Sequence, residues 1–139
     1  MSLTPFVYQD NELTTKKGKI QKFAFAYIFV GVCLLLPLYF FYEEVGSLLL
    51  SQNYSEGFYI IFWIANAYLI MTLTYLYESI FYAEHNTRII LFSNIASAVA
   101  NIGFNFLLVP FFAINGAIAA MLISVTIRFS FIFYRFKKL

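Results

Sequence analysis

Charged residues are scarce in this sequence. Of its 139 residues only 12% are Asp, Glu, Lys or Arg, whereas 62% are hydrophobic, and the mean hydropathy is +0.78. Soluble domains carry about 25% charged and about 45–50% apolar residues, so this composition excludes a water-soluble domain. A disordered chain is excluded too, because disorder requires low hydrophobicity and high charge. The composition therefore indicates an integral membrane protein.

Cysteine and histidine are almost absent. Cys33 is the only cysteine, which excludes a disulfide scaffold. His85 is the only histidine and has no second ligand at metal-binding spacing, so we expect no metal site and no cofactor. No pattern of nucleophile and base indicates an enzyme. The net charge of +2 is too small for a nucleic-acid-binding surface, so nucleic acid is not an expected partner.

Three long runs of the sequence contain no charge. A helix that crosses the hydrocarbon core needs roughly 20 apolar residues. The third run, 89–127, is nearly twice that length and contains the turn formers Pro110 and Asn115-Gly116, so we divide it into two spans. The sequence thus predicts an all-α fold with a cytoplasmic segment at 1–22 and four transmembrane helices in the region 23–139. The expected spans are about 23–42, 57–77, 89–109 and 114–134.

The basic residues predict the orientation of these helices. Four lysines precede the first span and three basic residues follow the last one, whereas the loop at 43–56 has none. Loops and tails rich in Lys and Arg stay in the cytoplasm. Both termini are therefore expected to be cytoplasmic, which agrees with an even number of spans. The flanking basic residues are Lys16, Lys17, Lys19, Lys22, Arg135, Lys137 and Lys138.

Three asparagines share one face of the third predicted span. Asn94, Asn101 and Asn105 follow the spacing i, i+7, i+11, and Asn66 in the second span is a candidate partner. Amides inside a membrane mostly form hydrogen bonds between helices, and we favour this interpretation. The alternative is that Asn101 and Asn105 line a polar cavity and contact a substrate.

Arg128 is the only charge predicted to lie inside a span. It lies six residues before Tyr134, or about 9 Å from the helix end, so we expect it to snorkel towards the cytoplasmic headgroups. Pairing with an anionic substrate is the alternative. No acidic residue is expected within a span, since Glu78 and Glu84 are placed at or beyond the interface, in water. A missing intramembrane carboxylate would argue against a self-contained proton-coupled pump.

The segment NIASAVANIGFNFLLVPFFAINGAIAAMLIS resembles the last hairpin of the polysaccharide biosynthesis flippases, relatives of the MATE exporters and peptidoglycan lipid flippases. The upstream segment LLLSQNYSEGFYII is similar to the outer loop of that family. The resemblance implies about twelve spans in two six-helix lobes around a central cavity, of which this chain matches the last four. The positions that carry the resemblance are Asn101, Asn105, Val109-Pro110, Gly116-Ala117 and Ala119-Ala120.

The resemblance implies a function in surface polysaccharide synthesis. The chain would be the C-terminal part of a multi-pass transporter in a bacterial inner membrane. The transporter would flip polyprenyl-pyrophosphate-linked oligosaccharide, as in O-antigen or capsule synthesis, with membrane lipid and the N-terminal helices of the same transporter as partners. The candidate substrate contacts are Asn101, Asn105 and Arg128. Two alternatives stay open: a small four-helix transporter that works as a homo-oligomer, and a non-transporting subunit that binds a glycosyltransferase.

Overall fold

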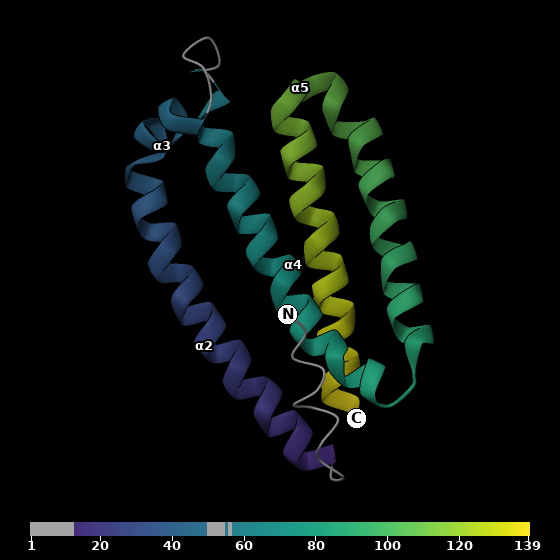
Figure 1. Ribbon diagram of the computed structural model, residues 1–139. Coiled ribbons are helices and arrows are strands. Elements are labelled where there is room, and N and C mark those ends of the chain that lie inside the picture. The colour runs from purple at the N-terminus through teal and green to yellow at the C-terminus, as the bar shows by residue number, and fades with distance from the viewer. Residues whose placement is uncertain (1–12, 50–54, 56) are drawn as a thin grey trace.

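The structure, a computed structural model, describes residues 13–49, 55 and 57–139, and over these residues its regular elements are all helices (Figure 1). The all-α prediction is confirmed. The part of the predicted N-terminal segment before residue 13 lies outside the described residues. The helices are α2 (Leu13–Phe40), α3 (Tyr42–Leu49), α4 (Tyr59–Ala83) and α5 (Thr87–Lys138).

Three of the described helices are long and apolar enough to cross a membrane, namely those that contain Thr15–Phe40, Tyr59–Ala83 and Thr87–Lys138. The longest of them, α5, is folded back on itself (Figure 1). Its backbone leaves the helical conformation at Ala113, where φ is 47° and ψ is −124°, shortly after Pro110. The helix therefore forms a hairpin with a first arm before Ala113 and a second arm after it.

The long helices form an open row rather than a closed bundle. The central helix, α4, packs against α2 on one side and against α5 on the other (Figure 1). Among the described residues, α2 approaches α5 near its own beginning, where the Lys17 ammonium lies 5.9 Å from the centre of the Phe136 ring. Towards α3 the two helices diverge (Figure 1).

The hydrophobic core lies at one end of this row, where α2 begins and α5 ends. The Tyr77 ring of α4 makes edge contacts with Phe136, Phe133 and Phe129 of α5, with ring centres 4.8, 5.4 and 6.0 Å apart. Such aromatic pairs stabilise a core beyond the area that they bury. The buried members of the cluster are Ile20, Ala24, Leu73, Tyr77, Ile80, Phe81, Ile90, Ile132 and Phe136.

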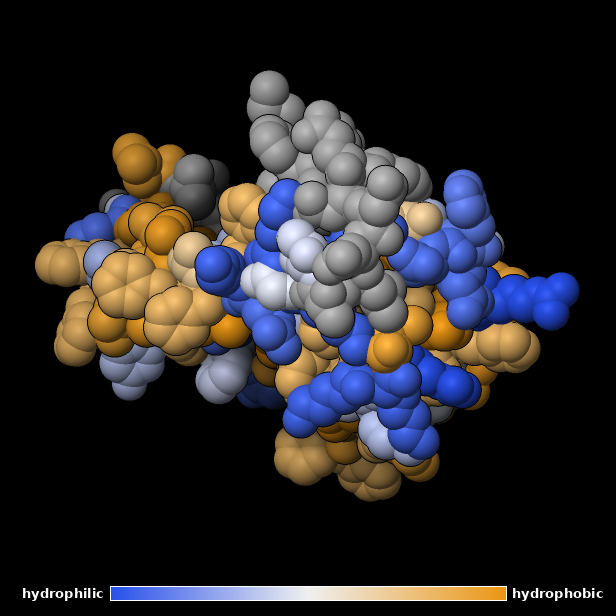
Figure 2. All heavy atoms as spheres, turned by 90° about the horizontal axis from the view of Figure 1, so that it is seen from below, coloured by the Kyte–Doolittle hydropathy of each residue, from blue (hydrophilic) through white to orange (hydrophobic). Residues whose placement is uncertain are grey.

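Most basic side chains lie at this same end, which we call the basic end. Figure 2 views the molecule from this end and shows hydrophilic residues gathered there between apolar flanks. Lys16 donates a hydrogen bond of 2.7 Å to Glu84, which joins α2 to the end of α4. The opposite end, where α3 and the turn of α5 lie, carries Glu43 and Glu44 and is called the fold-back end.

His85 forms the turn between α4 and α5. Its φ is 55°, a left-handed conformation in which glycine is the usual residue at a helix C-terminus. The amide of His85 donates to the carbonyl of Tyr82, and the amide of Asn86 donates to that of Phe81, at 3.1 and 2.8 Å. This pair of bonds is a Schellman motif. It ends α4 and begins the return of the chain into α5.

Candidate functional site: a buried ion pair between α4 and α5

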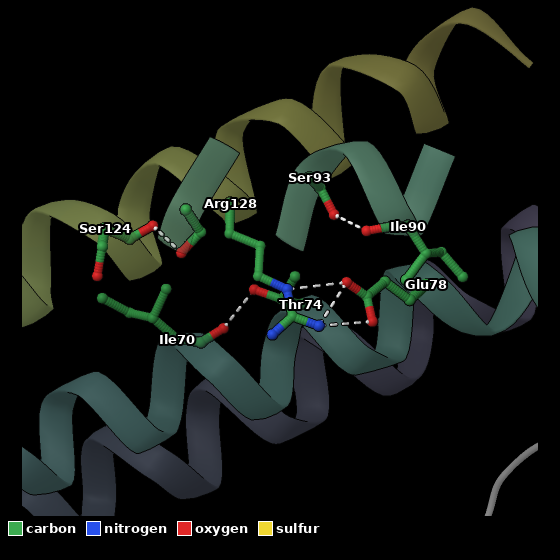
Figure 3. A network of polar contacts seen from close by, with 8 residues as sticks. Ile70, Thr74, Glu78, Ile90, Ser93, Ser124 and Arg128 are labelled. Carbon is green, nitrogen blue, oxygen red and sulfur yellow. Dashed lines mark hydrogen bonds and ion pairs between the residues drawn. The ribbon is translucent and has the colours of Figure 1, made fainter. Parts of the chain in front are cut away.

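Glu78 of α4 and Arg128 of α5 form a buried ion pair. Figure 3 shows the guanidinium of Arg128 reaching across from the second arm of α5 to the carboxylate of Glu78. Arg128 donates from Nε and Nη2 to Oε1 at 3.1 and 2.8 Å, and from Nη2 to Oε2 at 3.0 Å. The Glu78 side chain is 1% exposed and that of Arg128 is 14% exposed. Both carboxylate oxygens are thus satisfied away from solvent.

Buried hydroxyl groups surround the ion pair. Thr74, Ser93 and Ser124 are almost fully buried, and each donates a hydrogen bond of 2.8 Å to a carbonyl of its own helix. These short back-bonds satisfy the hydroxyl protons within the apolar interior. The guanidinium carbon of Arg128 lies 5.0 Å from the centre of the Tyr75 ring, a cation–π contact. The site is therefore a small polar layer that spans α4 and both arms of α5.

Two expectations about these charges are wrong. Glu78 is not in water at the membrane interface, because α4 continues to Ala83 and the side chain is buried inside that helix pair. Arg128 does not snorkel to the surface, because a carboxylate lies within hydrogen-bonding distance on the neighbouring helix. An intramembrane arginine that has such a partner is more stable paired than alone. Glu84 is the exposed member of the two glutamates and bonds Lys16.

The asparagines of the first arm of α5 join it to the second arm. Asn101 Nδ2 donates to the Ser124 hydroxyl at 3.2 Å, and Ser97 donates to the Ser124 carbonyl at 2.9 Å. Asn105 donates to the carbonyl and side-chain oxygens of Asn101, at 2.8 and 3.1 Å. Asn101 and Asn105 also line an open hollow of about 450 Å³ on the first arm. In this arrangement Asn101 forms a bond between helical arms while part of the amide face remains accessible.

Asn66 does not join this network. Its amide donates to the carbonyl of Phe62 at 2.9 Å, within α4 itself. Asn115, at the fold-back end, accepts a hydrogen bond from the Tyr59 hydroxyl and so ties the beginning of α4 to the second arm of α5. The predicted partnership between Asn66 and the α5 asparagines is therefore wrong, since Ser124 is the partner of Asn101.

The three candidate substrate contacts do not form one cluster. Asn101 and Asn105 belong to the amide network of the α5 hairpin, whereas Arg128 is held by Glu78 on α4. Ser124 lies one helical turn before Arg128 on the second arm and accepts the hydrogen bond of Asn101, so it lies between the amide network and the ion pair (Figure 3). Within the residues that the structure describes, no group of three His, Cys, Asp or Glu side chains could hold a metal ion. This polar layer holds α4 and the two arms of α5 together, and Arg128 keeps one terminal nitrogen, Nη1, that no hydrogen bond among the described residues uses.

No family model, curated protein or solved structure matches this chain.

Proposed function

We propose that this chain is the C-terminal part of a transporter that flips polyprenyl-pyrophosphate-linked oligosaccharide across a bacterial inner membrane. The proposal starts from the resemblance of segment 94–124 to the last hairpin of the polysaccharide flippases. In the structure this segment forms the fold-back of α5, and its small residues and asparagines hold the two arms together. A backbone hairpin of this kind is compatible with the last two spans of such a lobe.

The observation that carries the proposal is the open row of helices. A self-contained four-helix bundle closes around a common core. Here α2 and α5 flank α4 and diverge towards the fold-back end, so one face of α4 keeps exposed side chains (Figure 1). Such a layer has the form expected of part of a larger helical lobe. The proposal assigns the uncovered faces to further helices, to lipid and to the transport path.

The proposed orientation places the basic end in the cytoplasm. Two arms of α5, α4 and α2 then give four crossings, and the lysines of α2 and of the α5 end face the same side. A cysteine placed at Ala113 should react with an external membrane-impermeant maleimide, and one at Lys137 should not. External labelling at Lys137 would contradict this orientation.

The function is tested by reconstitution. The purified chain in liposomes is expected not to flip a fluorescent lipid-linked oligosaccharide, because an open layer cannot shield a hydrated diphosphate and sugars from lipid. Co-expression with the upstream helices of a resembling flippase should produce flipping. Robust flipping by the isolated chain would instead support the small homo-oligomeric transporter.

One observation favours that second candidate. Proton-coupled transporters use an ionisable group at membrane depth, and Glu78 is buried within a helix that is long enough to span the membrane. In this candidate Glu78 supplies the intramembrane carboxylate that a proton-coupled pump needs. Proton uptake that accompanies transport by the isolated chain, and its loss in Glu78→Gln, would separate this candidate from the flippase.

A further inference from the structure

The exposed aromatic residues differ between the central helix and the outer ones. On α2 the rings of Phe25 and Phe29 are 75% and 66% exposed, and on the first arm of α5 Phe106 is 79% exposed. On α4, Tyr68 is 55% and Tyr75 47% exposed. All these rings are about half exposed or more, so the helices differ in the type of exposed ring. The exposed tyrosines of the outer helices, Tyr39 and Tyr134, lie near helix ends, whereas α4 exposes the phenol of Tyr68 near its middle.

Three of the five tyrosines of α4 share one exposed face. Tyr68, Tyr75 and Tyr82 are spaced by seven residues, or two helical turns, and therefore lie above one another, and all are exposed. We call them the tyrosine face. Tyrosine at a membrane boundary is explained by the headgroups, but Tyr68 lies near the middle of Tyr59–Ala83. Among the described residues its hydroxyl has no hydrogen-bond partner, which is unfavourable in contact with lipid chains.

Arg128 lies at the edge of the tyrosine face. Its guanidinium packs over the Tyr75 ring, and its side chain is partly exposed. The Glu78 carboxylate accepts hydrogen bonds from Nε and Nη2 of Arg128. No hydrogen bond within the described residues uses the other terminal nitrogen, Nη1. A donor that is held in place by a carboxylate thus borders the row of phenol rings. The face offers hydrogen-bond donors and flat rings at membrane depth.

We propose that the tyrosine face, with Arg128 at its edge, is the wall along which the sugar and phosphate groups of the substrate pass. This inference rests on the proposed flippase function and assigns the contact surface within it. Phenol rings pack against the C–H faces of sugar rings while their hydroxyls bond sugar hydroxyls. The Nη1 group of Arg128 can donate a charge-assisted bond to a phosphate oxygen without leaving Glu78. A purely apolar wall would provide none of these contacts.

The first test asks whether the face meets water. In a Cys33→Ser background, which removes the exposed native cysteine, we introduce Tyr68→Cys, with Phe29→Cys and Val99→Cys as controls on the exposed outer helices. The protein is co-expressed with the upstream helices and treated with a water-soluble maleimide. Labelling at position 68 is expected to be about tenfold faster or more than at the two controls, since lipid suppresses the thiolate. Equal protection at all three positions would overturn the proposal.

The second test asks what occupies the face. The probes are a short-chain prenyl diphosphate that carries N-acetylglucosamine and the same prenyl diphosphate without a sugar. The sugar-bearing probe is expected to slow labelling of Tyr68→Cys about tenfold and the sugar-free probe much less. Equal protection by both probes would show that the lipid or phosphate, not the sugar, lies on the face. A disulfide that joins two copies of the Tyr68→Cys variant would show that a second copy covers it, and either result would overturn the proposal.

Conservative variants test the tyrosine hydroxyls themselves, and the outcomes below distinguish failure of this site from failure of the flippase function. Tyr68→Phe and Tyr75→Phe should each weaken binding of the sugar-bearing probe several-fold, whereas Tyr134→Phe, exposed at the basic end, should not. Unchanged binding in both face variants would overturn the proposal. Sugar-dependent protection in an assembly that does not flip the lipid would leave this site standing and refute the flippase function. Flipping by an assembly in which lipid protects position 68 from the maleimide would support the flippase function and refute the proposed site.

Discussion

The two ends of the molecule are held together by different kinds of contact. At the basic end, the aromatic rings around Tyr77 and the shielded pair of Glu78 and Arg128 fix α4 on α5. At the fold-back end, the Tyr39 ring of α2 contacts the Phe62 ring of α4, with 5.2 Å between ring centres, and Tyr59 donates a hydrogen bond to Asn115, but the buried core cluster does not extend there. Cooperative packing gives a segment a high local free energy of unfolding, and isolated contacts do not. We therefore expect the basic end to be the anchor and the fold-back end to open more readily.

Removal of one charge of the ion pair should have the largest effect and should act on the basic end. In Glu78→Gln the guanidinium of Arg128 remains buried without a counter-charge. We expect the free energy of unfolding to fall by about 3–5 kcal/mol. Denaturant titration in detergent micelles, followed by circular dichroism, measures this change.

The matched control removes both charges. Glu78→Gln combined with Arg128→Met leaves no buried charge, so it should recover most of the lost stability, because replacement of a whole pair is often neutral. A single variant as stable as the parent protein would show that the ion pair does not anchor the basic end.

The next largest effect is expected at the fold-back end. A methyl group on Gly116 would come within 2.5 Å of the backbone carbonyl oxygen of Leu108 on the other arm of α5. Gly116→Ala should therefore force the arms apart and cost about 1–3 kcal/mol. Gly103→Ala is the control, since nothing lies within 4 Å of the added atom there. If both alanine variants behave alike in thermal unfolding, close contact of the arms does not hold this end.

The amide network should contribute less than the glycine contact. Asn101→Ala removes the bond to Ser124, and we expect a loss of about 0.6–2 kcal/mol. Asn94→Ala, at an exposed position on the same arm, should change stability little. Hydrogen exchange of the first arm measures both variants, and the loss should be confined to the hairpin. Exchange that accelerates equally at the basic end would show that the two ends are not independent.

The smallest expected effect is a gain in stability at the basic end. His85 holds a left-handed backbone conformation that costs roughly 1–2 kcal/mol for a residue with a side chain. His85→Gly removes this cost but makes the unfolded chain more flexible, so we expect a net gain of about 1 kcal/mol or less. A slightly higher midpoint of thermal unfolding is the expected readout, with His85→Ala as the control that keeps the strain. A lower midpoint for glycine than for alanine would show that the imidazole itself stabilises the turn.

The sequence predicted the helices well because hydropathy is a property of a continuous run. The uncharged segments mark α2, α4 and α5, and Pro110 lies shortly before the break at Ala113. The helix ends are less visible in the sequence. The charged residues around Lys16 and Glu78 end an apolar run without ending the helix, since a helix can extend past its apolar part. For this reason the prediction that Glu78 lies in water was wrong.

The candidate site was harder to predict because its contacts join distant residues. Glu78 and Arg128 are 50 positions apart, and Asn101 and Ser124 are 23 apart, so no local spacing relates them. Spacing correctly placed Asn101 and Asn105 on one face but could not name their partner. The tyrosine face was accessible to the same spacing rule. What the sequence could not supply was its exposure on the central helix, next to Arg128.

The separation of Glu78 and Arg128 along the chain also sets an order for membrane insertion. Ribosomes add about 5–20 residues per second, so Glu78 is synthesised roughly 3–10 s before Arg128, which follows it by 50 positions. During that interval the carboxylate has no guanidinium, and an unpaired charge at depth is unfavourable. We expect α4 to stay at the translocon or near the bilayer surface until the second arm of α5 arrives. The second arm of α5, which is made later, thus allows the final placement of the earlier α4.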